Sequence, residues 1–231
     1  MFTGLVREIG TVRAVRRRRG VSVLELAAPA SAPQLAVGDS LAVDGICLTV
    51  TAVRPPLVTV EAVAQTRRLT TLGAWRAGRR VHLEPAVRAG DPLGGHLVSG
   101  HVEGTARLVA RRREGDALRL EFRAEPALLR RVPRQGSVAV DGVSLTVADR
   151  PGPDRFAVAV IPETQRATRL GGLRPGATVN LETDLLLRRD AAPADSGDAA
   201  SGTGALTMER ILSRGWGRGG TRGRAGGRGE G

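Results

Sequence analysis

The stretch Val43-Asp44-Gly45-Ile46-Cys47-Leu48-Thr49-Val50 recurs 97 positions later as Val140-Asp141-Gly142-Val143-Ser144-Leu145-Thr146-Val147. Further along the chain, residues 66–84 match residues 164–182 at an offset of 98, and ten of the nineteen positions are identical. Similarity at a nearly fixed offset is the signature of an internal repeat. The chain therefore contains a duplicated module.

A third pair of segments places the start of each module. Thr3-Gly4-Leu5-Val6 aligns with Ser99-Gly100-His101-Val102 at an offset of 96. Ala, Ser, Gly and Asp dominate the residues after the second module, and nine of the last eighteen residues are glycine. Such a composition buries too little apolar surface to offset the entropy of ordering. The expected organisation is a first barrel over 1–96, a second over 97–190, a linker over 191–204, a short helix over 205–214 and a disordered Arg/Gly-rich tail over 215–231.

Each module is rich in short β-branched runs that are separated by Gly, Pro, Asp and Ser. The runs are Val21–Leu26, Ser40–Val43, Leu48–Val53 and Val58–Val63 in the first module, and Ala117–Phe122, Ser137–Val140, Leu145–Ala148 and Phe156–Ile161 in the second. Asp44-Gly45 and Asp141-Gly142 favour tight hairpin turns, because glycine adopts positive φ freely. About six strands per module predict an all-β fold of two tandem six-stranded antiparallel Greek-key barrels, since closure removes exposed edges. Helical turns are expected at Pro29–Leu35 and Pro126–Arg131.

The composition is that of an ordinary globular protein, with 41% apolar and 25% charged residues. Apolar runs such as Val58–Val60 and Leu185–Leu187 are far shorter than the ~20 residues of a membrane-spanning helix. The segment Met1–Gly4 does not open a secretory signal. A single cysteine, Cys47, forms no internal disulfide. We expect a cytoplasmic protein that does not bind membranes.

The formal net charge is +12, and all 35 basic residues are arginine. The charge divides as +6 over 1–96, +4 over 97–190 and +2 over 191–231, which argues against one dedicated nucleic-acid face. Three Phe and two Trp are too few for a base-stacking platform. Specific nucleic-acid binding is not expected. The tail leaves an RNA-binding alternative, which predicts salt-sensitive oligonucleotide binding that is lost on truncation near Gly215.

The repeat places a thiol and a hydroxyl at equivalent positions, Cys47 and Ser144, directly after the two Asp-Gly turns. Small polar side chains there can bond a ligand in a cavity, and a thiol with a shifted pKa can act as a nucleophile or proton donor. The alternative is that Cys47 is a small buried hydrophobic residue, as free cysteine often is.

Two of the three histidines lie five residues apart in Gly94-Gly95-His96-Leu97-Val98-Ser99-Gly100-His101. Imidazole is the natural general base near neutral pH, so His96 and His101 are candidates for catalysis or ligand contact. A metal site is a rival interpretation, but it needs a third ligand such as His82 at no recognisable spacing. A further alternative is a glycine turn with solvated imidazoles.

Gln65-Thr66 and Glu163-Thr164 form a third matched pair, and each is followed by an arginine two residues after the threonine. Hydroxyls beside an amide or acid suit recognition of a polyol or a ring amide, whereas the structural alternative is hydrogen bonding at a turn. The sequence has no P-loop, dinucleotide fingerprint, Ser-His-Asp pattern or HExxH motif. Phosphate-transfer and nicotinamide enzymes are therefore disfavoured.

These motifs together resemble the alpha-type riboflavin synthase family. The resemblance rests on Met1–Val6, Gly38-Asp39-Ser40, the two Asp-Gly stretches, Gly94–Val102 and Ile161-Pro162-Glu163-Thr164. It covers about residues 1–190, and Met208–Leu212 is similar to the family's C-terminal trimer helix. The ordered motifs and the duplication make the resemblance specific.

The resemblance implies a transferase that acts on two molecules of 6,7-dimethyl-8-ribityllumazine. One donates a four-carbon unit to the other, which gives riboflavin and 5-amino-6-(ribitylamino)uracil. It also implies a homotrimer, in which the first barrel of one subunit faces the second barrel of a neighbour, and association with lumazine synthase. No cofactor and no metal are implied. A duplicated pocket suits a reaction between two identical molecules, because positioning alone can contribute ~7–11 kcal/mol.

The resemblance also assigns residues. Those expected to affect the rate are Phe2, Ser40, Cys47, His96 and His101. The first pocket would use Gly4, Leu5, Val6, Cys47, Leu48 and Thr49, with Glu61, Ala62, Val63, Ala64, Gln65 and Thr66 reaching in from the trimer partner. The second would use Gly100, His101, Val102, Gln135, Ser144, Leu145, Thr146, Val160, Ile161, Pro162, Glu163, Thr164 and Gln165. His101, or a water that it holds, would move the methyl proton, and Cys47 would assist nucleophilic addition or proton transfer.

Four positions depart from the family's usual pattern. Asp44 stands where Asn is common, Gln65 where Glu is common, Gln135 where Lys is common and Gln165 where Leu is common. The alternative function is that of a non-catalytic lumazine- or flavin-binding protein of the same fold. Retention of Cys47, His96 and His101 favours the enzyme, since the storage relatives usually lose polar catalytic positions.

Overall fold

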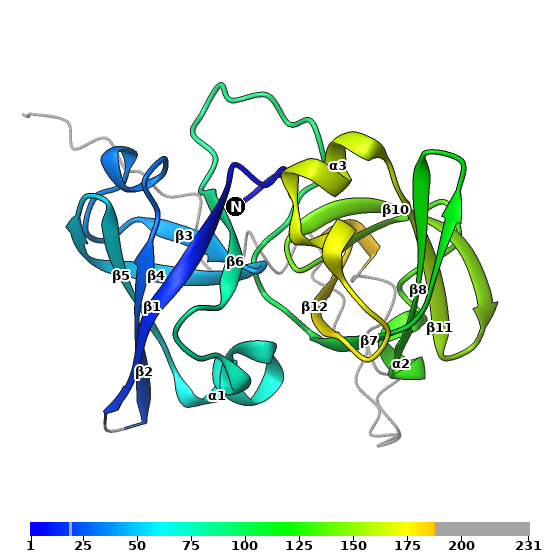
Figure 1. The fold of residues 1–231 in the computed structure, drawn as a ribbon, viewed down its shortest axis with the longest axis horizontal. Coiled ribbons are helices and arrows are strands. Elements are labelled where there is room, and N and C mark those ends of the chain that lie inside the picture. The colour runs from blue at the N-terminus through cyan, green and yellow to red at the C-terminus, as the bar shows by residue number, and fades with distance from the viewer. Residues whose placement is uncertain (19, 188–231) are drawn as a thin grey trace, which may run out of the picture. The chain divides into compact units, whose positions relative to one another are not determined.

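The structure is a computed structural model that describes residues 1–18 and 20–187. Within these residues the chain forms two closed six-stranded antiparallel barrels, which confirms the predicted all-β fold (Figure 1). The first barrel has the strand order β1-β2-β5-β4-β3-β6, and the second closes as β10-β11-β8-β7-β12-β9. Read from β7, the second order is the same as the first, so the two halves share one topology. The predicted linker, helix and tail over 191–231 lie outside the described residues.

The strands of the first barrel are β1(Glu8–Arg18), β2(Val21–Ala27), β3(Ser40–Val43), β4(Ile46–Arg54), β5(Leu57–Ala62) and β6(Arg80–Pro85). Those of the second are β7(Gly104–Glu114), β8(Ala117–Ala124), β9(Ser137–Val140), β10(Val143–Gly152), β11(Arg155–Val160) and β12(Thr178–Thr183). Burial alternates along β2, where every second side chain faces the core. The alternation expected of a half-buried strand is therefore present.

Short helical turns lie between the strands: η1(Ala32–Gln34), α1(Ala64–Leu69), η2(Thr71–Ala74), α2(Pro126–Leu129), α3(Pro162–Ala167) and η3(Arg169–Gly172). The turns predicted at Pro29–Leu35 and Pro126–Arg131 contain η1 and α2. The matched pairs Gln65-Thr66 and Glu163-Thr164 lie in α1 and α3. Among the described residues, no helix is long and apolar enough to cross a membrane.

The Asp-Gly turns have the predicted backbone. Asp44 and Gly45 have φ of 46° and 78°, and Asp141 and Gly142 have φ of 45° and 78°. Two successive positive φ values define the type I′ hairpin turn, which matches the twist of the flanking strands. Each turn joins two strands in close register, β3 with β4 and β9 with β10.

Each barrel has its own apolar core. Leu24, Val60 and Trp75 are fully or almost fully buried in the first core, and Phe122 and Phe156 stack with centroids 5.4 Å apart in the second. Each barrel therefore has an apolar core of its own, and a third, smaller cluster of Phe2, Ala42, Val98 and Ala139 joins the two halves.

Equivalent residues of the two halves meet each other, which places a pseudo-twofold axis between the barrels. Phe2 and Val98, related by the offset of 96, exchange backbone hydrogen bonds of 2.8 and 3.1 Å. Gly45 and Gly142 also pack together, and a Cβ atom on Gly45 would lie 2.6 Å from the Gly142 nitrogen. Glycine is required in both turns by this close approach as well as by φ.

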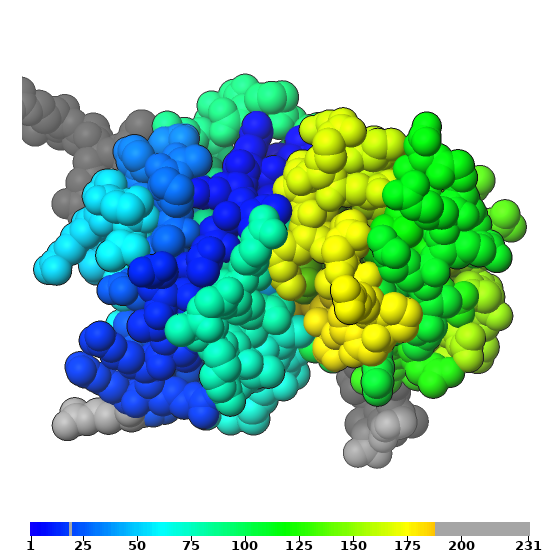
Figure 2. All heavy atoms as spheres, viewed as in Figure 1, coloured from blue at the N-terminus to red at the C-terminus, as the bar shows by residue number. Residues whose placement is uncertain are grey.

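The segment that opens each half crosses to the other barrel. Val6 packs against the second core, whereas Val102 packs against the first. Backbone hydrogen bonds of 2.8 Å from Ser144 N to Gly4 O and 2.9 Å from Cys47 N to Gly100 O fix the crossing. Figure 2 shows a second contact between the halves, where residues near 75 (teal) meet residues near 170 (yellow). The crossing decides which residues surround each candidate nucleophile.

Candidate functional site

A cavity of about 230 Å³ lies against the outer wall of the first barrel. Residues from β4, from α1 and its C-terminal end, and from the segment that crosses from the second half line it: Ile46, Cys47, Gln65, Thr66, Leu69, Thr70, Gly100, His101 and Val102. The structure thus brings together a thiol, an imidazole, hydroxyls and an amide that lie far apart in the sequence. We call this cavity the Cys47 pocket.

Strand alternation explains why the Cys47 side chain faces the pocket. Ile46, Leu48 and Val50 are buried in the barrel core, so Cys47 and Thr49 point to the opposite face of β4. Cys47 is half-buried there rather than part of the core. Cys47 thus lies outside the core of its own barrel, although it packs against the apolar cluster of Phe2, Ala42, Val98 and Ala139.

The crossing segment comes very close to Cys47. A Cβ atom on Gly100 would lie 2.5 Å from the Cys47 Cβ atom, and Gly100 has φ of +80°. The pseudo-symmetric Gly4, with φ of +74°, would place a Cβ atom 2.6 Å from the Ser144 Cβ atom. Both glycines let a second backbone cover a pocket-facing strand without a clash.

Two buried glutamates hold the crossing segments in place. Glu84 accepts hydrogen bonds of 2.7 Å from Thr3 N, 2.7 Å from Thr3 Oγ1 and 3.1 Å from Gly4 N. Glu182 accepts the equivalent bonds of 2.8, 2.7 and 3.0 Å from Ser99 N, Ser99 Oγ and Gly100 N. Burial raises the pKa of Glu84, while the bonds from Thr3 and Gly4 oppose that shift. Sequence reasoning did not give these residues a role, although their identity in both repeats was the available signal.

The second barrel places Ser144 beside His96. The His96 Nδ1 and Ser144 Oγ atoms are 2.6 Å apart, and His96 N donates to Thr3 O at 3.2 Å. Burial lowers the pKa of His96, and the Asp184 and Glu182 carboxylates partly offset the shift. His96 Nε2 is buried and has no hydrogen-bond partner within residues 1–18 and 20–187. His96 is therefore a neutral imidazole near pH 7, with one ring nitrogen able to accept a proton.

The structure corrects how the candidate residues are grouped. The prediction joined Gly4, Leu5 and Val6 to Cys47, and Gly100, His101 and Val102 to Ser144. Instead, Gly100, His101 and Val102 lie with Cys47, whereas Gly4 contacts Ser144 and Val6 packs on the second core. The reason is the crossing of the two opening segments. The two neighbouring histidines are consequently divided between the barrels.

Other candidate residues lie outside the Cys47 pocket. Phe2 is fully buried on the pseudo-twofold axis, and Ser40 lines a different cavity of about 220 Å³ with Asp39. Leu48 and Leu145 belong to the barrel cores. Gln135 has φ of 64° and donates its backbone N–H to Val147 O. Phe2, Leu48 and Leu145 therefore belong to apolar clusters, whereas Ser40 faces a cavity of its own.

The remaining candidates flank the pockets. Glu61 pairs with Thr49 between β5 and β4, and Thr146 pairs with Ser137 between β10 and β9. Before α1, Val63 is exposed and Ala62 is buried, and Ala64 begins that helix. Before α3, Val160 is buried and Ile161 exposed, and the helix itself contains Pro162, Glu163, Thr164 and Gln165.

The metal interpretation has no geometric support among the described residues. No group of three or more His, Cys, Asp or Glu side chains is arranged to hold a metal ion in that part of the chain. His82, one of the residues from which a metal site would need a third ligand, lies in a hydrogen-bonded cluster between the barrels, and its Nε2 accepts from Arg169 N at 2.7 Å.

Comparison with known proteins agrees with the duplicated fold. The Lumazine binding domain family matches residues 3–86 and again residues 99–184. Riboflavin synthase of Brucella abortus is 38% identical over 193 residues, which cover 81% of this chain and 95% of that protein. Riboflavin synthase of Mycobacterium bovis is 40% identical over 193 residues with the same coverage.

Solved structures of LumP resemble the fold. The complex of LumP with riboflavin superposes with a TM-score of 0.72 at 23% identity, covering 79% of this chain and 99% of that one. Its complex with 6,7-dimethyl-8-(1'-D-ribityl) lumazine gives a TM-score of 0.71 at 23% identity, with the same coverage. At this identity the likeness concerns the fold alone.

Proposed function

Since this chain belongs to the riboflavin synthase family, we propose that it catalyses the dismutation of two 6,7-dimethyl-8-ribityllumazine molecules. One molecule transfers a four-carbon unit to the other, and the products are riboflavin and 5-amino-6-(ribitylamino)uracil. One observation supports this above all: of the two equivalent positions of the repeat, Cys47 lines a cavity together with His101, and the Ser144 Oγ atom lies 2.6 Å from His96 Nδ1. Two identical substrates require two such sites.

The chemistry begins with loss of a proton from the 7-methyl group of one lumazine, which is acidic because the ring system delocalises the carbanion. A neutral imidazole can accept that proton, and burial lowers the pKa of the half-buried His96, which favours its neutral form near pH 7. In the Cys47 pocket, His101 or a water that it holds is the corresponding base. The Cys47 thiol assists nucleophilic addition to the acceptor lumazine or the accompanying proton transfer.

The position of the pocket supports a homotrimer. The Cys47 pocket lies on an outer wall, and its volume of about 230 Å³ is below the ~300 Å³ at which small-molecule sites usually begin. A bicyclic ligand there leaves one face for a second subunit to cover, and the exposed apolar Val63 and Ile161 flank α1 and α3. In the proposed trimer, the first barrel of one subunit faces the second barrel of its neighbour. Reaction across a subunit boundary follows from this arrangement.

Three further features belong to the proposal. The enzyme needs no cofactor, because the ring system of the substrate delocalises the negative charge. It works in the cytoplasm, where an unpaired cysteine such as Cys47 stays reduced. It associates with lumazine synthase, which would supply the substrate close to the pockets.

The test is incubation of the full chain with 6,7-dimethyl-8-ribityllumazine while riboflavin absorbance is recorded. One riboflavin formed for every two lumazines consumed is the expected stoichiometry. Loss of lumazine without flavin would reject the dismutation. Tight binding without turnover would support the alternative, a lumazine- or flavin-binding protein without catalytic activity. Sedimentation of the same sample tests the trimer independently.

A further inference from the structure

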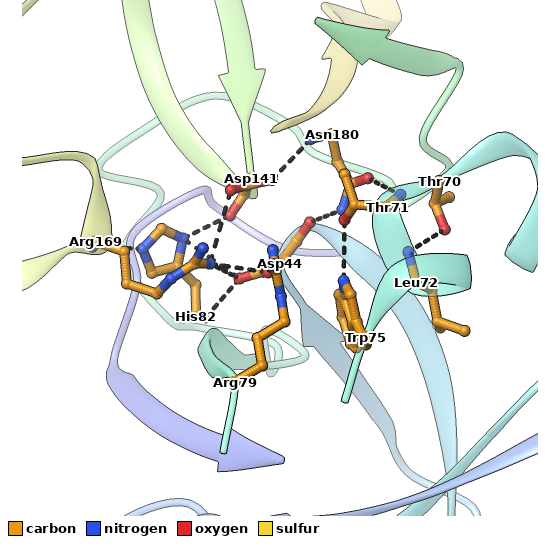
Figure 3. A network of polar contacts seen from close by, with 10 residues as sticks. All are labelled: Asp44, Thr70, Thr71, Leu72, Trp75, Arg79, His82, Asp141, Arg169 and Asn180. Carbon is orange, nitrogen blue, oxygen red and sulfur yellow. Dashed lines mark hydrogen bonds and ion pairs between the residues drawn. The ribbon is translucent and has the colours of Figure 1, made fainter. Parts of the chain in front are cut away.

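A buried polar cluster lies between the two barrels on the pseudo-twofold axis (Figure 3). It consists of Asp44, Arg79, His82, Asp141, Arg169 and Asn180, which we call the junction cluster. Asp44 and Asp141 are equivalent residues of the repeat, and so are His82 and Asn180. Equivalent positions therefore face each other in one low-dielectric site, but their contacts differ.

Asp44 has a complete set of partners for a charged carboxylate. Arg169 Nη1 lies 2.7 and 2.9 Å from its two oxygens, Arg79 Nη2 lies 3.0 Å from Oδ2, and His82 N donates to Oδ1 at 2.8 Å. The Asp44 side chain is fully buried. Two guanidinium groups and a backbone N–H stabilise the ionised form.

Asp141 has much weaker support for a charge. Its Oδ1 accepts one hydrogen bond of 2.7 Å from Asn180 N, while Oδ2 is buried and has no hydrogen-bond partner in the part of the chain that is described. The nearest cation, Arg169 Nη1, is 3.7 Å from Oδ2 and already contacts Asp44. An ionised carboxylate in this position would be buried with most of its capacity as an acceptor unused, which is costly.

His82 does not supply the missing positive charge. Its Nδ1 lies 2.8 Å from the Asp141 carbonyl oxygen, which only accepts, and its Nε2 lies 2.7 Å from the Arg169 N–H, which only donates. Nδ1 must therefore carry the proton and Nε2 must be bare, so the ring is neutral. Burial lowers the pKa of His82, against the raising effect of the nearby Asp44 carboxylate.

We propose that Asp141 is a neutral carboxylic acid in the folded protein, that Asp44 carries the negative charge of the pair, and that this single proton stabilises the junction of the barrels. The groups that face Asp141 are Asp44 from the β3–β4 turn, Arg79 and His82 from the region of β6, Arg169 from η3 and Asn180 from β12. Burial and the Asp44 charge raise the pKa of Asp141 to about 7, and Arg169 opposes them. The geometry and the electrostatics agree.

Ionisation of Asp141 weakens the junction for a definite reason. It places two carboxylates beside Arg169, which already contacts both oxygens of Asp44. Asp44 and Asp141 each lie three residues before a candidate site residue, Cys47 and Ser144. Because Gly45 and Gly142 are packed together between them, a shift of one turn is transmitted to the other. The proton thus stabilises the turns from which both pocket strands start.

The sign of the pH effect follows from linkage. The unfolded chain releases the Asp141 proton near the ordinary aspartate pKa of 3.8, whereas the folded protein keeps it up to a pKa of about 7. Stability from this group is complete below the unfolded pKa and is lost as pH rises through the folded pKa. Above the folded pKa, the loss of stability from ionised Asp141 no longer changes with pH.

The first test compares the free energy of unfolding of the full chain with that of Asp141→Asn as a function of pH. Asn keeps the Oδ1 acceptor but carries no charge and does not titrate. Between about pH 5 and 6.5 the unfolding constant of the unmodified protein should rise ~10-fold per pH unit relative to the variant, and the ratio should level off above about pH 8. Parallel pH curves would overturn the proposal.

The pseudo-symmetric variant Asp44→Asn is the matched control. Removal of the Asp44 charge takes away the buried carboxylate that the half-buried Arg79 and Arg169 contact directly, so this variant should be less stable than the unmodified protein at every pH. Equal behaviour of the two variants would overturn the assignment of one charged and one neutral carboxyl. If Asp44→Asn does not fold, that result agrees with the assignment, provided that Asp141→Asn folds.

Two further measurements keep the test independent of folding. Infrared difference spectra between the unmodified protein and Asp141→Asn should show the carbonyl band of a protonated carboxyl, and the band should vanish as pH rises through about 7. Its absence at pH 5.5 would reject the proposal. His82→Asn copies the residue at the equivalent position, Asn180, and should leave the band in place. Loss of the band in that variant would overturn its assignment to Asp141.

Discussion

The two barrels arise from one repeat, yet the equivalent positions Cys47 and Ser144 have different neighbours. The first has the Cys47 thiol in one cavity with His101 of a crossing segment, and the second has the Ser144 hydroxyl in contact with the half-buried His96. His96 lies between β6 and β7, in the segment that joins the two barrels. The asymmetry therefore follows from the connection between the barrels. It suits a reaction in which two identical molecules have different roles.

The largest expected effect tests the difference between the nucleophiles. Cys47→Ala should lower turnover by ~10²–10⁴-fold, the usual contribution of a positioned acid, base or nucleophile, and leave the fold intact. Ser144→Ala is the matched variant. It should lower turnover by a smaller factor, because the imidazole of His96 remains. Single-turnover riboflavin formation measures both, with circular dichroism as the control for folding. Near-normal turnover of Cys47→Ala would remove the thiol from the mechanism.

The next prediction tests whether the fold depends on the close approach of the two crossing segments to Cys47 and Ser144. Gly100→Ala and Gly4→Ala should each destabilise the fold by ~2–4 kcal/mol, because a new Cβ atom meets a strand backbone and φ is positive. Gly38 has φ of +96° with nothing within 4 Å of its Cβ position, so Gly38→Ala isolates the backbone strain. Gly38→Ala should lower the free energy of unfolding by only ~1–2 kcal/mol. Urea denaturation measures all three, and an equal cost at Gly38 would contradict a steric role of the crossing.

A smaller effect, on the pH dependence of stability, tests the protonation state of His96. The folded pKa of His96 is lowered by burial, so its neutral form contributes stability that is present above the unfolded value of 6.5 and is lost as pH falls through the folded pKa. His96→Gln should remove this acid sensitivity from the free energy of unfolding. The same variant should remove the corresponding limb from the pH profile of turnover. An unchanged acid limb of the stability curve would show that His96 titrates normally.

The smallest effect concerns the helices that flank the pockets. In α3, Glu163 and Arg166 form an exposed i,i+3 ion pair, whereas α1 has Gln65 in place of the glutamate. Gln65→Glu should therefore stabilise the fold by no more than ~0.5 kcal/mol, because exposed pairs are screened by solvent. Thermal denaturation at low and high salt measures it. A large or salt-independent gain would mean that residue 65 is less exposed than the structure indicates.

Much of the fold could be predicted from the sequence, because short-range sequence patterns determine its strands and turns. The Asp-Gly turns, the alternation of β2 and the repeat offset all indicate two barrels of one topology, as found. Several candidate side chains could also be singled out by their chemistry alone, and Cys47, Gln65, Thr66 and His101 do share a pocket. Thiol, imidazole, amide and hydroxyl groups are recognisable from residue type, whatever contacts they make in the folded chain.

The grouping of the candidates could not be predicted in the same way. The family resemblance implies that Gly4 lies with Cys47 and Gly100 with Ser144, each in the module that its segment opens. The structure reverses this, because Phe2 and Val98 pair on the pseudo-twofold axis and each segment continues onto the other barrel. No local pattern records a crossing of this kind. Glu84 and Glu182, which hold the crossing segments, were missed for the same reason.

The amino-acid order alone determined the duplication, the strands and turns, and the kinds of reactive group, since these depend on neighbours along the chain. Only the tertiary structure decided which imidazole meets which nucleophile, and which of Asp44 and Asp141 has cationic partners. Those outcomes depend on contacts between distant segments. Two equivalent residues of a repeat look the same in the sequence, and only tertiary packing gives them different neighbours.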